Sequence, residues 1–257
     1  MTSVELGGSS LGLGPGEVHV WRVELAPSSD QGVSLLSADE RGRAARYRSA
    51  QDRSRFVAAR SSLRQILGSY LDIRPEDLEF SYGLHGKPAL MDNPLRFNMS
   101  HSANMALFAV ALEMEVGIDL ESASVLLEPE SVVRRSMSPR ERRRLHLGDP
   151  EARNEAILAT WVRKEAVAKG RGDGMSLSLA KIETHPGLPA SNTRVRVRTR
   201  PSDRWFVSDI PVRRGWCGAL ATRRSAVSIR LFDLSTVIDL TGQAPLPSRI
   251  ASASLTP

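Results

Sequence analysis

Residues 116–121 have the sequence VGIDLE, and this segment decides how the rest of the chain is interpreted. Successive side chains of a strand point to opposite faces, so Ile118 and Leu120 share one face while Asp119 and Glu121 share the other. The apolar face predicts a strand that packs against a core. Two neighbouring carboxylates repel each other unless a cation lies between them, and a hard divalent ion such as Mg²⁺ suits them. For this segment alone, two solvent-facing acids at a strand end remain the favoured alternative.

Similar patterns of strands and helices occur on both sides of this segment. Before it, alternating apolar and polar residues predict a strand at 18–25. Ser37 and Glu40 have capping-box spacing, which predicts helices over 38–70 with a break near Ser49 and a buried stripe that includes Phe56. A loop at 81–88 and strands at 97–100 and 105–112 follow. After the segment we expect helices at 128–135, 139–147 and 151–169, then strands at 177–184, 193–200, 205–210, 217–222 and 226–232.

The chain is expected to have two α/β halves that join near residues 112–117, with a ligand site between them. The predicted divisions are a flexible Gly- and Ser-rich lead at 1–16, halves at 17–114 and 115–233, and a disordered Pro-, Ser- and Ala-rich tail at 234–257.

The composition of the 257 residues is that of a globular protein, with 41% hydrophobic and 25% charged residues. The formal net charge of +6 predicts an acidic partner or ligand. The single cysteine, Cys217, excludes an internal disulfide and a cysteine-based zinc site, and it is expected to be a buried structural thiol. We find neither a signal peptide nor a membrane-spanning apolar stretch, so the expected compartment is the cytoplasm.

Residues 161–169, WVRKEAVAK, form a second cluster on a predicted helix. Trp161, Glu165 and Lys169 are spaced by four residues and share one face, with Lys164 beside them. One interpretation is a buried Trp with an exposed Glu–Lys pair. The other has Glu165 as a third carboxylate of a metal site and the lysines as phosphate ligands.

A third cluster combines residues 86–88, GKP, with residues 97–102, FNMSHS. Lys87 projects from a tight turn as a point charge suited to phosphate, and Ser100 and His101 can donate hydrogen bonds to phosphoryl oxygens. A structural role for the histidine is the alternative. A Ser–His–Asp hydrolase site is poorly supported, because adjacent strand residues point to opposite faces.

Two arginine-rich runs are interpreted mainly as solvated faces. One includes Arg43 and Arg60 on the early helices, and the other comprises Arg194, Arg196, Arg198 and Arg200. Aromatic residues make up 5% of the chain and none interleaves with these arginines, so a base-stacking platform is weakly supported.

Taken together and in this order, the clusters are specific: the chain resembles the phosphopantetheinyl transferases of the surfactin-synthetase-activating (Sfp) type. That family has a Gly-Lys-Pro loop, a Phe-Asn-x-Ser-His-Ser segment, a Gly-Ile-Asp-Ile/Leu-Glu strand and a Trp-x-x-Lys-Glu-x-x-x-Lys helix. All four motifs are present here, and the resemblance covers roughly residues 18–232.

The resemblance implies an α/β (α+β) fold, a monomer of two similar halves related by pseudo-twofold symmetry with coenzyme A in the cleft between them. Asp119, Glu121 and Glu165 match the family's magnesium ligands. The residues that match its coenzyme A contacts are Lys87, Ser100, His101, Asp119, Glu165 and Lys169, together with Arg43 in a loosely matched stretch.

The implied reaction transfers 4′-phosphopantetheine from coenzyme A to a serine of an acidic acyl or peptidyl carrier protein and releases 3′,5′-ADP. Glu165 is the expected general base, directly or through water, and Lys169 is expected to neutralise charge on the transferred phosphate. Neither a nucleic acid nor a membrane is an expected partner. Two alternatives stay open: a non-catalytic coenzyme A-binding scaffold and a basic nucleic-acid-binding protein.

Overall fold

The computed structural model describes residues 11–25, 30–125, 128–145, 149–198 and 203–234. The predicted tail after residue 234 and most of the predicted flexible lead lie outside these residues. Within the rest of the lead, Leu11 and Leu13 are buried in the core, so this part of the chain packs, contrary to the prediction.

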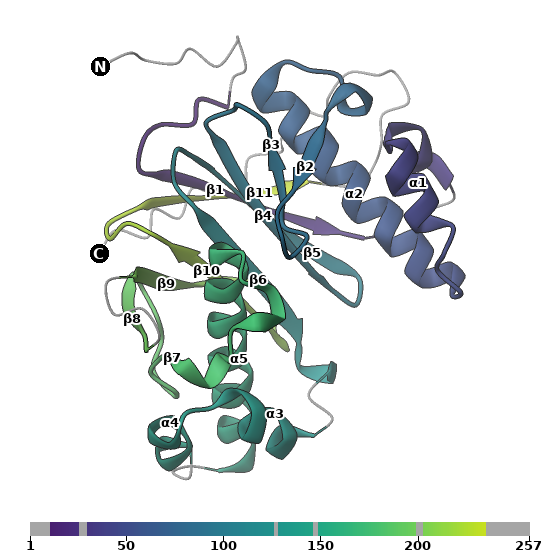
Figure 1. The fold of residues 1–257 in the computed structure, drawn as a ribbon. Coiled ribbons are helices and arrows are strands. Elements are labelled where there is room, and N and C mark those ends of the chain that lie inside the picture. The colour runs from purple at the N-terminus through teal and green to yellow at the C-terminus, as the bar shows by residue number, and fades with distance from the viewer. Residues whose placement is uncertain (1–10, 26–29, 126–127, 146–148, 199–202, 235–257) are drawn as a thin grey trace.

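The N-terminal half is built on a four-stranded sheet with the order β11-β1-β5-β4. Helix α2 covers one face of this sheet, and α1 lies beside it (Figure 1). The predicted capping box of Ser37 and Glu40 is confirmed at the start of α1. The predicted break near Ser49 is also confirmed, and there the Ser49 side chain caps α2. The elements are β1 (Glu17–Glu24), η1 (Asp30–Leu35), α1 (Ala38–Ala44), α2 (Ala50–Leu71), η2 (Pro75–Asp77), β4 (Leu95–Ser102), β5 (Met105–Leu112) and β11 (Ser228–Leu234).

The C-terminal half contains a five-stranded sheet with the order β6-β10-β9-β8-β7 and the long helix α5. The three predicted helices are confirmed. The predicted strand at 177–184 is wrong for most of its length, because short 3₁₀ turns precede a two-residue β7. The elements are β6 (Val116–Ser122), η3 (Ala123–Val125), α3 (Pro129–Ser136), α4 (Pro139–Arg144), α5 (Pro150–Arg171), η4 (Gly174–Ser176), η5 (Leu179–Lys181), β7 (Ile182–Glu183), β8 (Thr193–Val197), β9 (Arg204–Ile210) and β10 (Trp216–Thr222).

The two sheets pack against each other, and each carries one long helix on its outer face. Strand β5 shows the layering: Phe108 and Val110 face the core under α2, whereas Leu107 and Ala109 face the core shared with β6 and β10. This is the period of two expected of a strand buried on both faces. The order of layers is therefore helix, sheet, sheet, helix, in two halves that each contain a helix of 22 residues.

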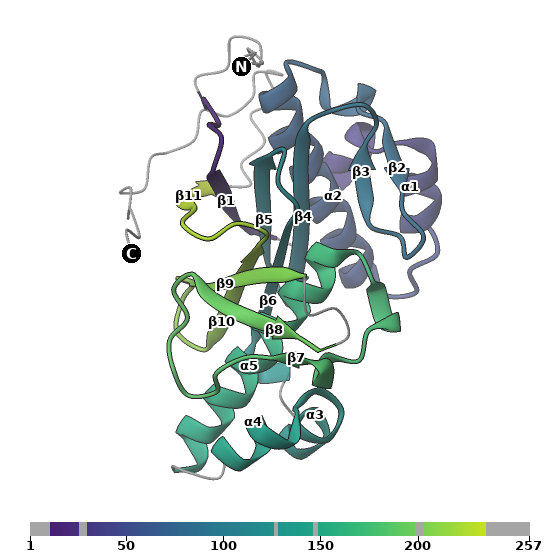
Figure 2. The same cartoon turned by 60° about the vertical axis from the view of Figure 1, so that its left-hand side comes forward.

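Two topological features differ from the sequence predictions. Strand β11 was expected in the C-terminal half but pairs in parallel with β1, and the two lie side by side in Figure 1 (yellow and purple). The expected loop at 81–88 is a hairpin of β2 (Phe80–Tyr82) and β3 (Pro88–Leu90), which projects beside β4 (Figure 2).

Helix α5 approaches β6 very closely, because glycines stand at the contact. A Cβ on Gly117 would lie 2.0 Å from the Ala166 carbonyl oxygen, and one on Gly170 would lie 2.6 Å from the Trp205 ring. This approach brings the end of α5 against the strand that carries Asp119. No helix among the described residues combines the length and apolar character needed to cross a membrane.

Candidate active site

Strands β4 and β6 meet where the two sheets adjoin, and polar side chains join them. The Asn98 Oδ1 atom accepts a hydrogen bond from the Ile118 amide at 2.8 Å. The Ser102 Oγ atom accepts one from the Ser122 amide at 3.4 Å. Alternate residues of the FNMSHS segment therefore face β6, and Ser100 lies between these two contacts.

Asp119 is the centre of the polar cluster at this junction. Its side chain is 2% exposed, and its Oδ1 accepts hydrogen bonds from Ser100 Oγ at 2.8 Å and from Lys169 Nζ at 2.6 Å. Lys169 Nζ also donates to Ser100 Oγ at 2.8 Å. The second oxygen, Oδ2, is buried and has no hydrogen-bond partner among the described residues. An unpartnered buried carboxylate oxygen is costly in a folded protein and indicates a position where a ligand can bind.

Two further carboxylates share this environment. The pKa of Glu121 is raised to about 7, mainly by burial; the charges of Asp119 and Glu165 contribute to the rise, while Ser102 and Lys169 oppose it. Burial also raises the pKa of Glu165, and Asp119 adds to the effect. The Trp161 indole N–H donates to Glu165 Oε1 at 3.3 Å. The predicted trio of acids is thus close enough for mutual repulsion, and Asp119 is not the solvent-facing acid of the alternative interpretation.

The trio is not a preformed metal centre. Within the described part of the chain, no three acidic, histidine or cysteine side chains are grouped closely enough to hold an ion. The Lys169 ammonium lies against Asp119 and supplies positive charge there. The donor set nevertheless fits a hard cation, because all donors are carboxylate oxygens, one oxygen is unpartnered, and the acids repel each other.

A pocket of about 250 Å³ opens beside Lys169 and brings together four residues expected to contact coenzyme A. Ser100 and His101 come from β4, Lys169 from α5 and Arg43 from α1. Desolvation lowers the pKa of His101, and the cations Lys169 and Arg55 lower it further, although the ring remains accessible to solvent. The pocket therefore favours an anion, whose charge would oppose these shifts.

The same pocket contains residues that the sequence analysis did not assign. Tyr47 and Phe56 line it with ring centroids 5.3 Å apart, and the Arg43 guanidinium lies 5.4 Å from the Phe56 centroid. Arg60 also lines it but is buried, with its Nε donating to Glu40 at 2.5 Å, so it is not part of a solvated face. No local signal distinguishes Arg60 from its exposed neighbours, because Glu40 lies on another helix.

Lys87 is not brought into this pocket. Its Nζ donates to the Gly170 carbonyl at 2.8 Å and pairs with Glu115 at 2.7 Å. It thereby binds the C-terminal end of α5, where a cation is favourable. Lys87 lines a neighbouring pocket of about 360 Å³ together with Tyr82.

Lys164 is fully buried although it adjoins Glu165. Its ammonium donates to Glu141 Oε2 at 2.5 Å, the Ser136 carbonyl at 2.7 Å and the Leu179 carbonyl at 3.2 Å. Lys164 therefore joins α5 to the segments around α4 and is not a free phosphate ligand.

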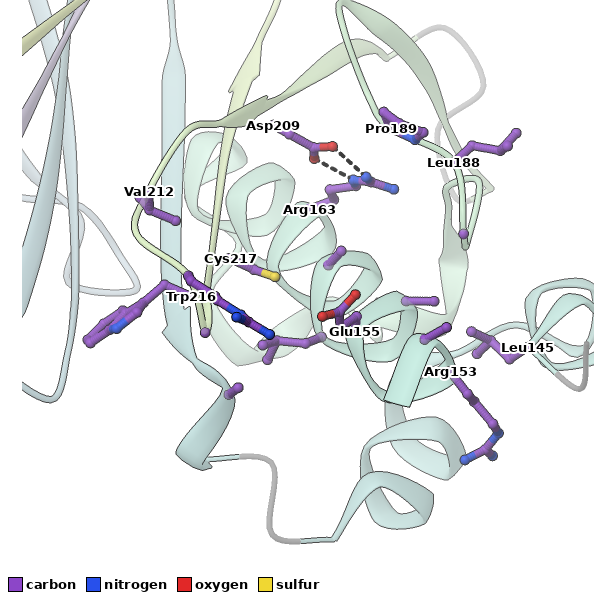
Figure 3. A pocket seen from close by; sticks show the side chains of 18 of the residues that line it. Leu145, Arg153, Glu155, Arg163, Leu188, Pro189, Asp209, Val212, Trp216 and Cys217 are labelled. Atoms are coloured by element: carbon purple, nitrogen blue, oxygen red, sulfur yellow. Dashed lines mark hydrogen bonds and ion pairs between the residues drawn. The ribbon is translucent and has the colours of Figure 1, made fainter. Parts of the chain in front are cut away.

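A larger pocket of about 670 Å³ lies along a different face of α5 (Figure 3). Arg163 and Asp209 in its wall form an ion pair at 2.6 Å, so each neutralises the charge of the other. Cys217 also lines it and is only half-buried, not fully buried as predicted; burial raises the pKa of its thiol to about 11. This pocket contains none of the predicted catalytic residues.

Comparisons with known proteins agree with the motifs. Residues 115–221 match the model of the 4′-phosphopantetheinyl transferase superfamily, and residues 24–113 match the model of the N-terminal part of a 4′-phosphopantetheinyl transferase. The chain is 40% identical over 182 residues to the 4′-phosphopantetheinyl transferase HetI of Nostoc sp., covering 68% of this chain and 77% of HetI.

Two further relatives carry the same description. The 4′-phosphopantetheinyl transferase AcpT of Escherichia coli O157:H7 is 30% identical, with 63% of this chain and 82% of AcpT covered. The 4′-phosphopantetheinyl transferase Sfp of Bacillus subtilis is 28% identical, with 57% of this chain and 65% of Sfp covered. A solved structure titled apo-ACPS, from Chronobacterium ammoiniagenes, covers 42% of this chain and 94% of its own at 22% identity. Its TM-score of 0.34 is too low to support an argument.

The four motifs, the two-half fold and the extent of the match to HetI lead to one conclusion: the chain belongs to the 4′-phosphopantetheinyl transferase family and is an enzyme that transfers phosphopantetheine to carrier proteins.

Proposed function

We propose that this enzyme is of the Sfp type and transfers 4′-phosphopantetheine from coenzyme A to a carrier-protein serine in a Mg²⁺-dependent reaction. The main support is the cluster of Ser100, Asp119 and Lys169, which has an unpartnered Asp119 oxygen and lies beside the pocket that Arg43 and His101 line.

The pocket of about 250 Å³ is the proposed site for phosphates of coenzyme A. Arg43 and Lys169 supply positive charge, and Ser100 and His101 supply hydrogen-bond donors. Lys87 is proposed to contact coenzyme A from the neighbouring pocket at the end of α5. These groups come from both halves, so the substrate would bind across the junction.

Asp119, Glu121 and Glu165 are the proposed ligands of Mg²⁺. Bound there, the ion would supply positive charge that stabilises the diphosphate oxygens and the departing 3′,5′-ADP. The unpartnered Asp119 oxygen and the mutual repulsion of the acids support this assignment.

Glu165 is the proposed general base, directly or through a water molecule. Burial and the neighbouring Asp119 charge raise its pKa, which makes its carboxylate a stronger proton acceptor than that of an ordinary surface glutamate. In the transfer, the serine oxygen forms a bond to phosphorus and its proton passes to Glu165. The phosphorus–oxygen bond of the diphosphate breaks and its electron pair leaves with 3′,5′-ADP. Lys169 neutralises charge on the transferred phosphoryl group.

The experiment is mass spectrometry of an apo carrier protein incubated with this enzyme, coenzyme A and Mg²⁺. We expect the carrier to gain the mass of one phosphopantetheine group, and EDTA to prevent the gain. Transfer that persists in EDTA would contradict the metal assignment. Coenzyme A binding without transfer to fatty-acid, polyketide or peptide carriers would favour the non-catalytic scaffold.

We further propose that the enzyme acts as a monomer in the cytoplasm without a nucleic-acid or membrane partner. The three acids Asp119, Glu121 and Glu165 argue against a nucleic-acid partner, because carboxylates repel a phosphate backbone. Steeply salt-dependent binding to duplex DNA would contradict it.

A further inference from the structure

The pocket of about 360 Å³ beside the β2–β3 hairpin, here called the hairpin pocket, contains a carboxylate that the proposed function leaves unexplained. The hairpin projects beside β4 in Figure 2 and supplies Tyr82 and Lys87, while β4 supplies Arg96 and the end of α5 supplies Arg171. Glu115, in the connection between β5 and β6, is the only acid among the described residues that line this pocket. Its negative charge opposes the binding of any anion there.

Glu115 joins two cations of the pocket wall. Its Oε2 atom lies 2.7 Å from Lys87 Nζ, and its Oε1 atom lies 3.2 Å from Arg96 Nε. The third cation, Arg171, forms ion pairs with two aspartates of the C-terminal half. Each oxygen of the Glu115 carboxylate therefore faces a different cation, in the arrangement that two oxygens of a phosphate group would also adopt.

The two ion pairs of Glu115 are accessible to solvent and can be exchanged for others. The Glu115 side chain is 47% exposed, and that of Arg96 is 39% exposed. Ion pairs with this degree of exposure contribute little to the stability of a protein. A diphosphate or a phosphate monoester brings more negative charge and more acceptor oxygens than one carboxylate, so it can replace Glu115 as the partner of both cations.

The hairpin pocket adjoins the proposed catalytic cluster through the end of α5. Lys87 Nζ donates to the Gly170 carbonyl at 2.8 Å. The preceding residue, Lys169, donates to Asp119 at 2.6 Å. Coenzyme A carries a diphosphate and a separate 3′-phosphate, so an anion at Lys87 can belong to the same molecule whose other phosphates lie beside Lys169.

We propose that Glu115 competes with an anionic group of coenzyme A for Lys87 and Arg96, and that the substrate displaces it on binding. This inference rests on the proposed function, which assigns Lys87 but neither Glu115 nor Arg96. Glu115 thereby determines the affinity for coenzyme A without touching the reacting atoms. The opposing interpretation is a structural brace, in which Glu115 holds Lys87 in place for the substrate, and it predicts the opposite effect of removing the carboxylate.

The test is calorimetry of coenzyme A binding, in buffer with Mg²⁺, to wild type and to Glu115→Gln. We expect the Kd to fall about fivefold, which corresponds to roughly 1 kcal/mol, because the amide keeps the size of the side chain but not its charge. The single-turnover rate at saturating coenzyme A should stay within about twofold of wild type. Arg96→Gln should raise the Kd about threefold or more. A raised Kd in both variants would show a brace and overturn the proposal, as would an unchanged Kd in Glu115→Gln.

The matched control is Glu113→Gln, which removes an exposed carboxylate from the same connection but outside the hairpin pocket. A fivefold fall of the Kd in this control would indicate a general charge effect and overturn the proposal. In a Lys87→Gln background, Glu115→Gln should change the Kd by about twofold or less, because one of the two contested cations is absent. A full fivefold gain in that background would contradict competition for Lys87.

Failure of the proposed function would appear differently, as absence of transfer by wild type. The calorimetric comparison requires only coenzyme A binding, so it would still decide this inference. Tighter binding by Glu115→Gln would support it, and equal affinities of the two proteins would overturn it. Failure of both proteins to bind coenzyme A would overturn the inference together with the proposed function.

Discussion

Helix α5 carries two lysine–carboxylate pairs five residues apart that have nearly the same length but different surroundings. Lys164 lies 2.5 Å from Glu141, and Lys169 lies 2.6 Å from Asp119. The Lys164 side chain is 0% exposed and that of Lys169 is 34% exposed. Only the first pair has both members fully hydrogen-bonded.

The two pairs differ in how completely their carboxylate oxygens are hydrogen-bonded, and this difference separates a structural pair from a reactive one. Both Glu141 oxygens have partners: Thr184 donates to Oε1, and the Ser138 amide joins Lys164 at Oε2. Asp119 leaves Oδ2 without a partner in the described structure. A fully bonded buried pair holds segments together, whereas a pair with spare acceptor capacity and neighbouring acids is arranged to receive a ligand.

The largest expected effect is on catalysis beside the Lys169–Asp119 pair, whose Asp119 Oδ2 atom has no hydrogen-bond partner in the described structure. Glu165→Gln should lower kcat for carrier modification by roughly a thousandfold, since the amide cannot accept the serine proton. The circular dichroism spectrum and the unfolding midpoint should stay close to wild type, because Glu165 forms few structural contacts. The control is Glu155→Gln, an exposed glutamate on the same helix. Near-normal turnover of Glu165→Gln would contradict the assignment of the base.

Substitution in the fully hydrogen-bonded Lys164–Glu141 pair is expected to cause a large loss of stability. Lys164→Met leaves the Glu141 charge buried without its counter-ion and should lower the free energy of unfolding by about 3 kcal/mol or more. Urea denaturation measures this, with exposed Lys181→Met as control. A loss below about 0.5 kcal/mol, the range of ordinary surface substitutions, would show that the pair is not structural.

His19 in the N-terminal half extends the comparison to a buried group whose charged form is disfavoured by burial. Its Nδ1 lies 2.6 Å from the Tyr70 hydroxyl, which also accepts a hydrogen bond from the Trp21 indole N–H at 3.0 Å. Burial lowers the pKa of His19 from 6.5 to about 4; the Arg230 charge also lowers it, and Glu17 opposes the shift.

The unfolded chain therefore binds a proton between pH 6.5 and about 4 that the folded protein does not bind. Stability from this group is complete above this window and falls as the pH decreases, by roughly 3 kcal/mol in total. Denaturation across this window should show a smaller slope with pH for His19→Gln than for wild type. Equal slopes would contradict the role of His19.

The smallest expected effect is at Glu121. Glu121→Gln removes one of three mutually repelling acids and should raise the free energy of unfolding by less than about 1 kcal/mol in metal-free buffer. Thermal unfolding in EDTA measures it, and Glu113→Gln at an exposed turn is the control. A clear loss of stability would mean that Glu121 has a structural role like that of Glu141.

The local elements could be predicted because their signals lie within a few residues of each other. The Ser37–Glu40 capping box, the break before α2 and the alternation around Asp119 all follow from local spacing. The 177–184 region could not be predicted, because its apolar residues pack against α5 as 3₁₀ turns and the spacing resembles that of a strand.

The roles within the WVRKEAVAK motif show the limit of sequence reasoning. Its spacing placed Trp161, Glu165 and Lys169 on one face, which the structure confirms through the Trp161–Glu165 hydrogen bond and the shared surroundings of Asp119. The same spacing could not assign Lys164, because its partners at Glu141, Ser136 and Leu179 belong to other elements.

The sequence by itself determined the family, the helices and most strands, and which residue types could carry the chemistry, because these depend on periodicity, capping and short motifs. Only the tertiary structure decided that β11 returns to β1, that Ser100 and Lys169 converge on Asp119, and that Lys87 binds the end of α5. These contacts join residues distant in the chain, and their stability depends on burial and charge that exist only after the two sheets have packed together.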